Sequence, residues 1–182
     1  MHTYRDLDSF EYWSITDKDQ FSIAVLKGLI MDAVKKANSG HPGGAMSSAD
    51  FIYLLFKDYL KFDPKDPNWF DRDRFILSGG HMSMLQYSIL HLVGWMKLSE
   101  IKKFRQLGSH TPGHPEVEIP GVECTTGPLG QGFAMGVGMA LAEAYLSNLI
   151  SNNDKESKKL IDHFTYVLAT DGDLQEPVAL GA

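Results

Sequence analysis

Three histidines stand in glycine- or proline-rich segments, where a ligand can approach the chain closely. His41 lies in SGHPGG, His81 in SGGHMS and His114 in TPGHPE. An imidazole has a pKa near neutrality, so it can donate and accept protons at working pH. Each histidine taken alone could equally be a turn residue whose ring bonds a nearby carbonyl group. The occurrence of three such segments favours a common site.

Asp171 directly follows the segment that is most typical of a buried strand, residues 164–169. A carboxylate in that place can bind a hard cation such as Mg²⁺, which commonly links one or two carboxylates to phosphate oxygens. The next residue, Gly172, would let a phosphate approach the backbone. The alternative is that Asp171 caps a helix.

A second glycine-rich run, TTGPLGQG at 125–132, precedes a segment of small and apolar residues that is typical of a helix. Its free amides and the positive end of the helix dipole could bind a phosphate. From spacing alone, a tight turn that packs the small residues of this helix against a neighbour explains the run equally well.

The other histidines predict no metal site. His110 and His114 are four residues apart, but Pro112 between them excludes the helix that would bring both rings to one face. We therefore reject a zinc site there. His91 lies on the apolar face of a predicted helix and is interpreted as a core histidine, while His2 and His163 belong to no constellation.

The elements that would position these residues are helices and short strands in alternation. We expect helices over 21–36, 47–61, 82–93, 99–104 and 133–149, strands over 74–78 and 164–169, a helical turn after Pro177, and a solvated connection over 151–159. The second helix should begin with a capping box from Ser47 to Asp50, and Ser99 should cap the fourth. This order predicts an α/β fold in which helices flank a mostly parallel sheet, with ligands beyond the carboxyl ends of the strands.

The composition limits the classes of function. The chain has 182 residues, 43% of them hydrophobic, and a formal net charge of −6, which predicts one globular domain with its own core. Because no long basic block occurs, we expect no nucleic-acid partner. The single cysteine, Cys124, and a start without the pattern of a secretion signal favour the cytoplasm. The most apolar segment, Leu85 to Trp95, is short and interrupted by polar residues, so we expect a soluble protein with no membrane partner.

Five motifs occur in a fixed order: SGHPGG, DRDRFILSGGHMSML, FRQLGSHTPGHPE, TTGPLGQG and TDGDLQEP. In order and spacing they resemble the amino-terminal, diphosphate-binding domain of the transketolase family, over residues 20–182. The resemblance implies a partial thiamine-diphosphate-binding fold. It also implies that residues 1–182 are this diphosphate-binding (PP) domain, incomplete at its carboxyl end.

The resemblance also implies roles for residues around a bound thiamine diphosphate. His81 and Gly172 would contact the diphosphate, and Asp171 would ligate Mg²⁺ or Ca²⁺. Gly127 and Leu129 would line the cofactor between two subunits.

Three further residues carry catalytic roles in the same comparison. His41 and His114 would face the sugar, bond its hydroxyl and carbonyl groups, and help to move protons. Glu176 would lie in a proton-sharing network that joins the two active sites of a homodimer with a second transketolase subunit.

The resemblance implies an enzyme that transfers a two-carbon ketol unit from a ketose phosphate to an aldose phosphate. The donor would be a sugar such as xylulose 5-phosphate and the acceptor one such as ribose 5-phosphate, in the pentose phosphate pathway. Three positions depart from the family pattern: Thr170 and Pro177 each stand where glycine is usual, and Met82 is a lesser departure. Pro177 is closer to the homodimeric pyruvate dehydrogenase first component, so decarboxylation of a 2-oxo acid is an alternative. A non-catalytic or split-subunit domain is another.

Parts of the family's machinery lie beyond Ala182 in the resemblance. They are a second metal-ligating side chain, an asparagine, the domain that grips the aminopyrimidine, and the basic residues that hold the sugar phosphate. We therefore expect the chain to be the front of a longer transketolase and to be inactive alone.

Overall fold

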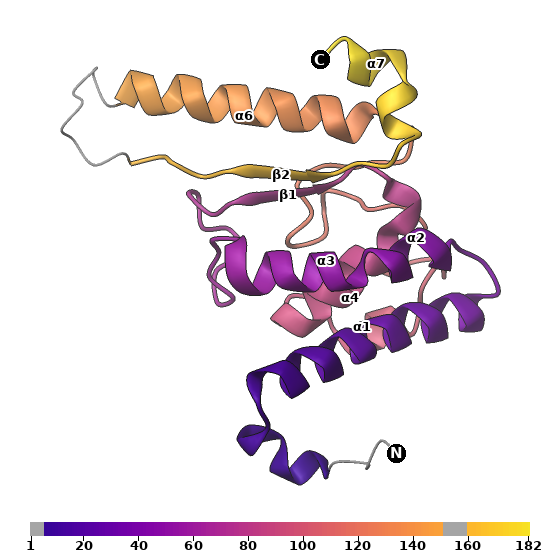
Figure 1. Cartoon of the computed structure of the whole chain (residues 1–182). Helices are drawn as coiled ribbons and strands as arrows, with labels where there is room; N and C mark the ends of the chain where they lie inside the picture. Colours follow the sequence, from indigo (N-terminus) through magenta and orange to yellow (C-terminus); the bar gives the residue numbers. More distant parts are fainter. Residues whose placement is uncertain (1–5, 151–159) are drawn as a thin grey trace.

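The chain folds into three layers, with helices on both faces of a small parallel sheet (Figure 1). The computed structural model describes residues 6–150 and 160–182, so the predicted connection 151–159 and His2 lie outside the described residues. The predicted α/β class is confirmed. The α-helices are α1 (Ile15–Ala37), α2 (Pro42–Ser47), α3 (Ala49–Leu54), α4 (Ser83–Val93), α5 (Leu98–Ile101), α6 (Gln131–Ile150) and α7 (Pro177–Leu180). The strands are β1 (Arg74–Leu77) and β2 (Thr165–Leu168), and short 3₁₀ or π turns cover Leu7–Tyr12, Leu55–Tyr59, Gly80–Met82 and Asp173–Gln175.

The two strands pair in parallel, from Arg74 opposite Thr165 to Leu77 opposite Leu168. Both strands are short and apolar, as the sequence predicted, and alternate residues point to opposite faces. Because the strands run in the same direction, their carboxyl ends lie at one edge of the sheet.

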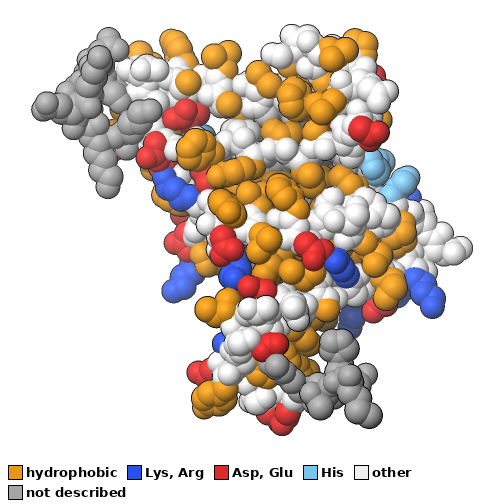
Figure 2. All heavy atoms as spheres, viewed as in Figure 1, with side chains coloured by type: hydrophobic (Ala, Val, Ile, Leu, Met, Phe, Trp, Pro, Cys, Tyr) orange, Lys and Arg blue, Asp and Glu red, His pale blue; other side chains and the backbone are white. Residues whose placement is uncertain are grey.

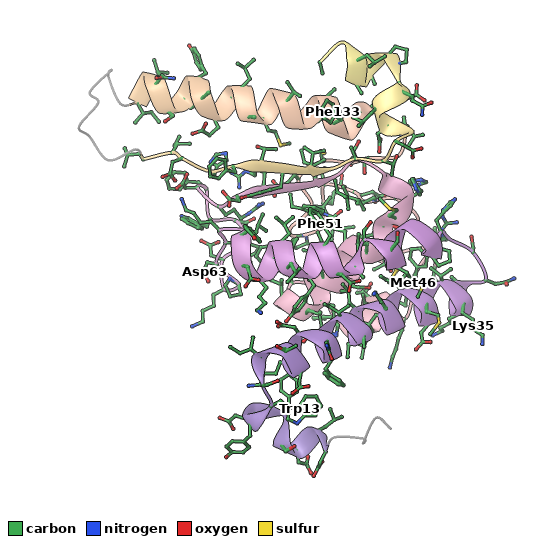
Figure 3. The ribbon with its side chains drawn as sticks, in the orientation of Figure 1. Trp13, Lys35, Met46, Phe51, Asp63 and Phe133 are labelled. Atoms are coloured by element: carbon green, nitrogen blue, oxygen red, sulfur yellow. The ribbon has the colours of Figure 1, made fainter. Side chains whose placement is uncertain are left out.

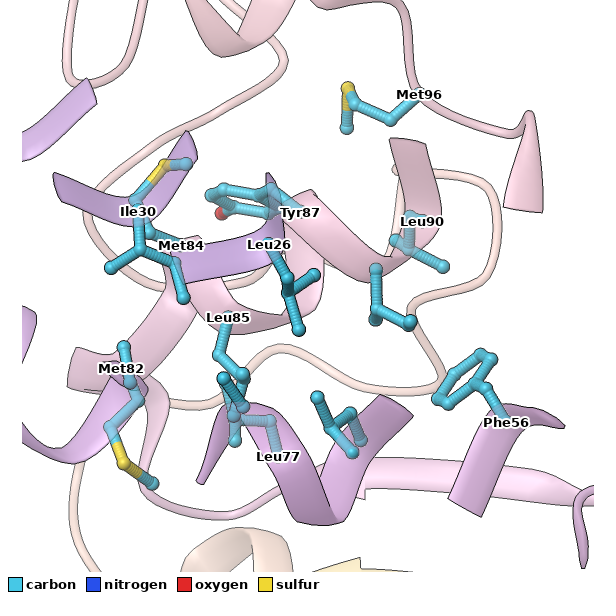
Figure 4. Close-up of a cluster of buried hydrophobic side chains, with 14 of the residues drawn as sticks. Leu26, Ile30, Phe56, Leu77, Met82, Met84, Leu85, Tyr87, Leu90 and Met96 are labelled. Carbon is cyan, nitrogen blue, oxygen red and sulfur yellow. The ribbon is translucent and has the colours of Figure 1, made fainter. Parts of the chain in front are cut away.

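The main hydrophobic core lies between one face of the sheet and the helices α1, α3 and α4 (Figure 4). Leu26 and Ile30 of α1 and Leu85 and Leu90 of α4 are completely buried there. Leu77 reaches the same core from β1. Burying side chains of this size stabilises the fold by roughly 1.5–3 kcal/mol each.

The long helix α6 covers the other face of the sheet. It packs closely because Gly136 has no side chain: a β-carbon placed there would lie 2.4 Å from Val167 of β2 and 3.4 Å from Ile76 of β1. The helix has 20 residues, and an 18-residue window within it has a mean hydropathy of 1.3, so by length and composition alone it could cross a membrane. The expectation that the most apolar segment is the short one at Leu85 to Trp95 is therefore wrong, because α6 is an apolar helix of the length of a membrane span.

The first helix is longer than its apolar spacing predicts. The Ser14 hydroxyl accepts a hydrogen bond from the Asp17 amide at 3.2 Å, so the helix begins in the polar segment before Phe21. It ends at Asn38, whose φ of 50° is left-handed, as is common after a helix.

The predicted capping box after the first glycine-rich loop is wrong. Ser47 is the last residue of α2, and its hydroxyl donates to the Gly44 carbonyl at 3.1 Å. Asp50 forms an ion pair with Lys27 of α1 at 2.5 Å instead. The helical segment starts earlier, at Pro42, because proline suits the first position of a helix.

The helix predicted over 99–104 is shorter than expected. It covers only Leu98–Ile101, and its cap residue, Lys97, makes no side-chain cap. Ser99 therefore lies inside the helix and does not cap it, and Phe104 lies in the turn that follows.

An aromatic cluster closes the amino-terminal end of the described chain. Trp13 lies 5.2 Å from Phe10 and 5.5 Å from Phe21 between ring centroids. Figure 3 shows Trp13 below α1, at the opposite end of the molecule from Phe133 of α6. The cluster therefore holds the first turn against α1, away from the carboxyl ends of the strands.

Candidate functional site

The candidate site lies where the two strands end. β1 continues into Ser78, Gly79 and the 3₁₀ turn Gly80–Met82 that carries His81, and β2 continues into Thr170. The Ser78 amide donates to the Leu168 carbonyl at 3.0 Å, which joins the two segments side by side. The strand topology thus brings the predicted His81 and Asp171 segments together, as expected for a parallel sheet.

The structure brings His41 and His81 into contact. Their ring centroids are 5.3 Å apart and the rings are nearly perpendicular, at 70°. His41 is the residue before α2, so that helix presents it toward the end of β1. Figure 2 shows histidine side chains gathered at one edge of the molecule, beside the carboxyl ends of the strands.

His114 joins this pair from the long loop. Burial, followed by the positive charge of Arg105 and by His41 and His81, lowers the pKa of His114 below its ordinary value. His114 is therefore more often neutral near pH 7 than a free histidine, and a neutral imidazole can both donate and accept a hydrogen bond. His41, His81 and His114, which the sequence predicted to form a common site, therefore lie close enough to influence one another electrostatically.

A buried tyrosine fixes the His114 loop. The Tyr87 hydroxyl of α4 donates to the carbonyl oxygens of Pro112 and His114, at 3.0 and 3.1 Å. The Ser83 hydroxyl of the same helix donates to the Gly113 carbonyl at 3.0 Å. Burial raises the pKa of Tyr87 far above its ordinary value, so it stays protonated and keeps donating.

Arg105 links two histidine loops, a role that the sequence did not indicate. It donates to the Ser39 hydroxyl at 2.6 Å, two residues before His41. A β-carbon placed on Gly113 would lie 3.0 Å from its guanidinium, so the guanidinium rests directly on the His114 loop. An open cavity of about 500 Å³ lies here, lined by Arg105, Gln106, Leu107, Pro112, Gly113 and His114.

The TTGPLGQG loop lies against the histidines and the Asp171 segment. A β-carbon on Gly127 would lie 3.7 Å from the His114 ring, and one on Gly172 would lie 3.4 Å from Leu129. Gly80 allows this approach, because a side chain there would collide with Thr126 and the Gly127 amide at 2.7 and 3.0 Å. The predicted cofactor-lining residues are therefore neighbours of the predicted diphosphate and sugar ligands.

One backbone amide of this loop, Gly130, and one at the start of α6, Phe133, are already used inside the protein, which corrects the expectation that the amides here are free. The Gly130 amide donates to the Asp173 carboxylate and the Phe133 amide to the Ser78 hydroxyl, at 2.8 and 3.0 Å. Neither amide is free for a phosphate. The tight-turn alternative accounts better for this end of the loop, since a β-carbon on Gly132 would lie only 2.6 Å from Ser78.

Asp173 is completely buried and was missed by the sequence analysis. Its carboxylate accepts hydrogen bonds from Ser78, Gly130 and Thr170. Burial alone would raise its pKa, but these hydrogen bonds together hold the pKa below its ordinary value. The available signal was its place directly after the Asp171–Gly172 pair.

Asp171 is exposed and does not cap the turn that follows it, whose cap residue is Gly172. The helix-cap alternative is therefore wrong. Residues 6–150 and 160–182 contain no group of three or more His, Cys, Asp or Glu side chains that could hold a metal ion alone. One accessible carboxylate beside a glycine fits a Mg²⁺ ion that takes its other ligands from phosphate and water.

Glu176 lies at the amino end of α7, after the Asp173–Gln175 turn. A β-carbon on Gly130 would lie 2.8 Å from the Cβ atom of Glu176. The structure therefore places Glu176 against the carboxyl end of the TTGPLGQG loop, and its contact with the site passes through that loop.

Two further histidines, His91 and His163, have structural partners. His91 Nδ1 lies 2.8 Å from the Met96 carbonyl oxygen, as expected for a satisfied core histidine. His163, for which the sequence indicated no constellation, lies with Nδ1 3.4 Å from Asp71 near the amino ends of the strands.

Comparison with known proteins identifies relatives across almost the whole chain. The family described as "Transketolase, thiamine diphosphate binding domain" matches residues 18–182. The transketolase of Staphylococcus aureus (strain MW2) is 52% identical over 164 residues, which cover 90% of this chain and 24% of the relative. Transketolase 2 of Escherichia coli (strain K12) is 56% identical over 156 residues, or 85% of this chain and 23% of that protein.

Solved structures agree with the sequence comparison. The transketolase of Pichia stipitis in complex with sedoheptulose-7-phosphate superposes with a TM-score of 0.83 at 48% identity, over 89% of this chain and 24% of that one. The transketolase of Leishmania mexicana has the same TM-score at 43% identity, with the same coverage. This chain spans about a quarter of the length of the relatives that it matches.

Proposed function

This chain belongs to the transketolase family, as a thiamine diphosphate binding domain. From that premise we propose that it contributes to the transfer of a two-carbon ketol unit from a ketose phosphate to an aldose phosphate. Xylulose 5-phosphate is the proposed donor and ribose 5-phosphate the proposed acceptor, as in the pentose phosphate pathway. The observation that carries the proposal is the convergence of His41, His81 and His114 beside the Asp171 segment at the carboxyl ends of the strands.

The diphosphate and its cation are assigned to the turns after β1 and β2. His81 can donate a ring N–H to a phosphate oxygen, and Gly172 leaves room for the diphosphate at the backbone. Asp171 would ligate Mg²⁺ or Ca²⁺, both of which take oxygen ligands. The exposed position of Asp171 supports a cation that is shared between the protein and the diphosphate.

Gly127 and Leu129 are assigned to the wall of the cofactor site between two subunits. Their support is their position, since Gly127 lies against His114 and Leu129 lies against Gly172. An apolar Leu129 side chain beside the diphosphate turn would help to exclude water from the cofactor.

His41 and His114 are assigned to the sugar. Thiamine diphosphate, when bound, supplies a ring that stabilises a carbanion. What remains for the protein is to orient the sugar and to move protons at its hydroxyl and carbonyl oxygens, and a neutral imidazole suits both tasks. The lowered pKa of His114 supports this role, because it favours the neutral ring near pH 7.

Glu176 is assigned to a proton-sharing network with a second transketolase subunit. Its place against the TTGPLGQG loop supports a link between the subunit interface and the cofactor. A homodimer follows from the same assignment.

The proposal also covers location and further partners. The net charge of −6 gives no support for nucleic-acid binding, and the single cysteine fits a reducing cytoplasm. We propose a cytoplasmic enzyme whose partners are sugar phosphates and a second subunit, with neither nucleic acid nor membrane as a partner.

The test is a ketol-transfer assay on the protein as its gene encodes it. With thiamine diphosphate and Mg²⁺, xylulose 5-phosphate and ribose 5-phosphate should yield a seven-carbon ketose phosphate, and His81→Ala and Asp171→Asn should each weaken cofactor binding. Pyruvate offered as the donor separates the 2-oxo acid alternative, which predicts its decarboxylation. Absence of both reactions, together with no binding of thiamine diphosphate, would favour a non-catalytic domain and contradict the proposal.

A further inference from the structure

Four hydrogen-bond donors converge on the carboxylate of Asp173, which is completely buried. Its Oδ1 atom accepts from the Ser78 hydroxyl and from the Gly130 amide, each at 2.8 Å. Its Oδ2 atom accepts from the amide and the hydroxyl of Thr170, again at 2.8 Å each.

The donors come from three segments that carry the candidate site. Ser78 begins the turn that leads to His81, Gly130 ends the loop that holds Gly127 and Leu129, and Thr170 precedes Asp171 and Gly172. Ser78 is 95 residues and Gly130 43 residues from Asp173 along the chain. A single carboxylate therefore joins parts of the site that are distant in sequence.

Only a carboxylate satisfies this set of donors. The Ser78 hydroxyl accepts from the Phe133 amide, and the Thr170 hydroxyl accepts from the Asp173 amide, so both hydroxyl hydrogens are committed to the carboxylate. An asparagine has one acceptor oxygen, and its NH₂ group would face either the Gly130 or the Thr170 amide. One buried N–H would then lose its acceptor, which is costly in a dry environment.

We propose that Asp173 is a positioning residue, whose carboxylate sets the spacing of three segments: Ser78–His81, Gly127–Gly130 and Thr170–Gly172. This spacing fixes the geometry in which the segments bind a diphosphate with its divalent cation. The ligand class rests on the proposed function above. The positioning itself rests on the hydrogen bonds of Asp173.

Asp73 provides a matched control within the same chain. It is also buried, at 3% exposure, and accepts the amides of Lys61 and Phe164 at 2.8 and 2.7 Å. These bonds lie at the amino ends of the strands, opposite the site. Asp73→Asn should therefore weaken the fold as Asp173→Asn does, without disturbing the site.

The first measurement is the dissociation constant for thiamine diphosphate at saturating Mg²⁺, in the protein as its gene encodes it, alongside the unfolding midpoint without ligand. Asp173→Asn should raise the dissociation constant about tenfold or more, since hydrogen bonds to a charged group are lost. Asp73→Asn should lower the midpoint and leave the dissociation constant within about twofold. Equal dissociation constants in both variants would overturn the proposal.

A milder variant covers the case in which Asp173→Asn fails to fold. Thr170→Ala removes one donor and keeps the backbone amide, and it should raise the dissociation constant in the same direction by a smaller factor. If Thr170→Ala leaves the dissociation constant unchanged and Asp173→Asn does not fold, Asp173 acts in folding only. That result would contradict the proposal.

Amide hydrogen exchange separates this inference from the proposed function. In the absence of ligand, Asp173→Asn should speed exchange at Gly130 and Thr170 together, and Asp73→Asn should not. If exchange is faster in Asp173→Asn but the wild-type protein binds no thiamine diphosphate, the proposed ligand is refuted and the positioning role of Asp173 is supported. Exchange that is unchanged at Gly130 would refute the positioning.

Discussion

The close approach of α6 to the end of β1 makes Gly132→Ala a sharp test of the fold. A β-carbon at position 132 would lie 2.6 Å from the Cα atom of Ser78 and 3.0 Å from its Cβ atom. Ordinary contact begins at 3.4 Å, so the backbone must move by about 0.8 Å. Backbone cannot rotate away as a flexible side chain can.

The expected loss follows from the packing. Overfilling a well-packed site costs typically about 1–3 kcal/mol. The displacement would also stretch the hydrogen bond from the Phe133 amide to Ser78, which contributes on the order of 1 kcal/mol. We expect Gly132→Ala to lower the free energy of unfolding by about 3 kcal/mol.

Gly138→Ala in the same helix is the matched control. No atom lies within 4 Å of a β-carbon at that position, and the residue is exposed. Alanine restricts the unfolded chain and favours the helix, so this substitution should stabilise the protein by about 0.5–1 kcal/mol.

Thermal unfolding followed by circular dichroism measures both effects. For a chain of this length, 1 kcal/mol corresponds to a shift of about 2–4 °C in the midpoint. Gly132→Ala should lower the midpoint by roughly 6–12 °C and Gly138→Ala should raise it slightly. A neutral or stabilising Gly132→Ala would refute the described contact between α6 and Ser78.

Four further predictions concern the loops and the segments beside the strands. Arg105→Gln should raise the pKa of His114, measured by NMR titration of the imidazole, because a positive neighbour is removed; an unchanged pKa would contradict the assigned cause. The pKa of His114 is lower in the folded than in the unfolded protein, so the unfolded state binds a proton more readily. His114 should therefore lower the free energy of unfolding as the pH falls through about 6.5 and have no such effect well above that pH. Urea unfolding at a series of pH values measures this dependence. Tyr87→Phe should cost about 1–2 kcal/mol and speed amide exchange in the loop that it holds, whereas unchanged exchange would argue against its anchoring role. Arg72 and Glu123 form an ion pair whose side chains are only 11% and 9% exposed. Glu123→Ala should therefore lower the free energy of unfolding in urea by about 3 kcal/mol, because it leaves a buried Arg72 without its carboxylate partner, and a loss below about 1 kcal/mol would contradict this reasoning.

The strands and the layer order were predictable because each strand leaves a short apolar run that ends in a turn, although β2 is only half-buried where the sequence predicted a buried strand. Helix boundaries were less predictable where packing overrides local preference. The glycines after Pro42 disfavour a helix, yet Gly44 lies inside α2, where a β-carbon would meet the Met82 sulfur at 2.5 Å. This contact between distant segments leaves no signal in the local sequence.

The candidate site divides in the same way. His41, His81 and His114 could be selected because their glycine- and proline-rich surroundings mark loops. Asp173 carries only the weaker signal of its place after Asp171 and Gly172, since its importance depends on donors that reach it from distant positions in the chain. The two alternatives for TTGPLGQG stayed open for the same reason, because the acceptor of the Gly130 amide, Asp173, is remote in sequence.

The binding site for the diphosphate and its cation would be seen in a crystal structure of the protein as its gene encodes it, with thiamine diphosphate and Mg²⁺ bound. We expect diphosphate oxygens within hydrogen-bond distance of His81 and of the Gly172 backbone, and the cation on Asp171. A diphosphate bound elsewhere, or a cation held without Asp171, would contradict this expectation.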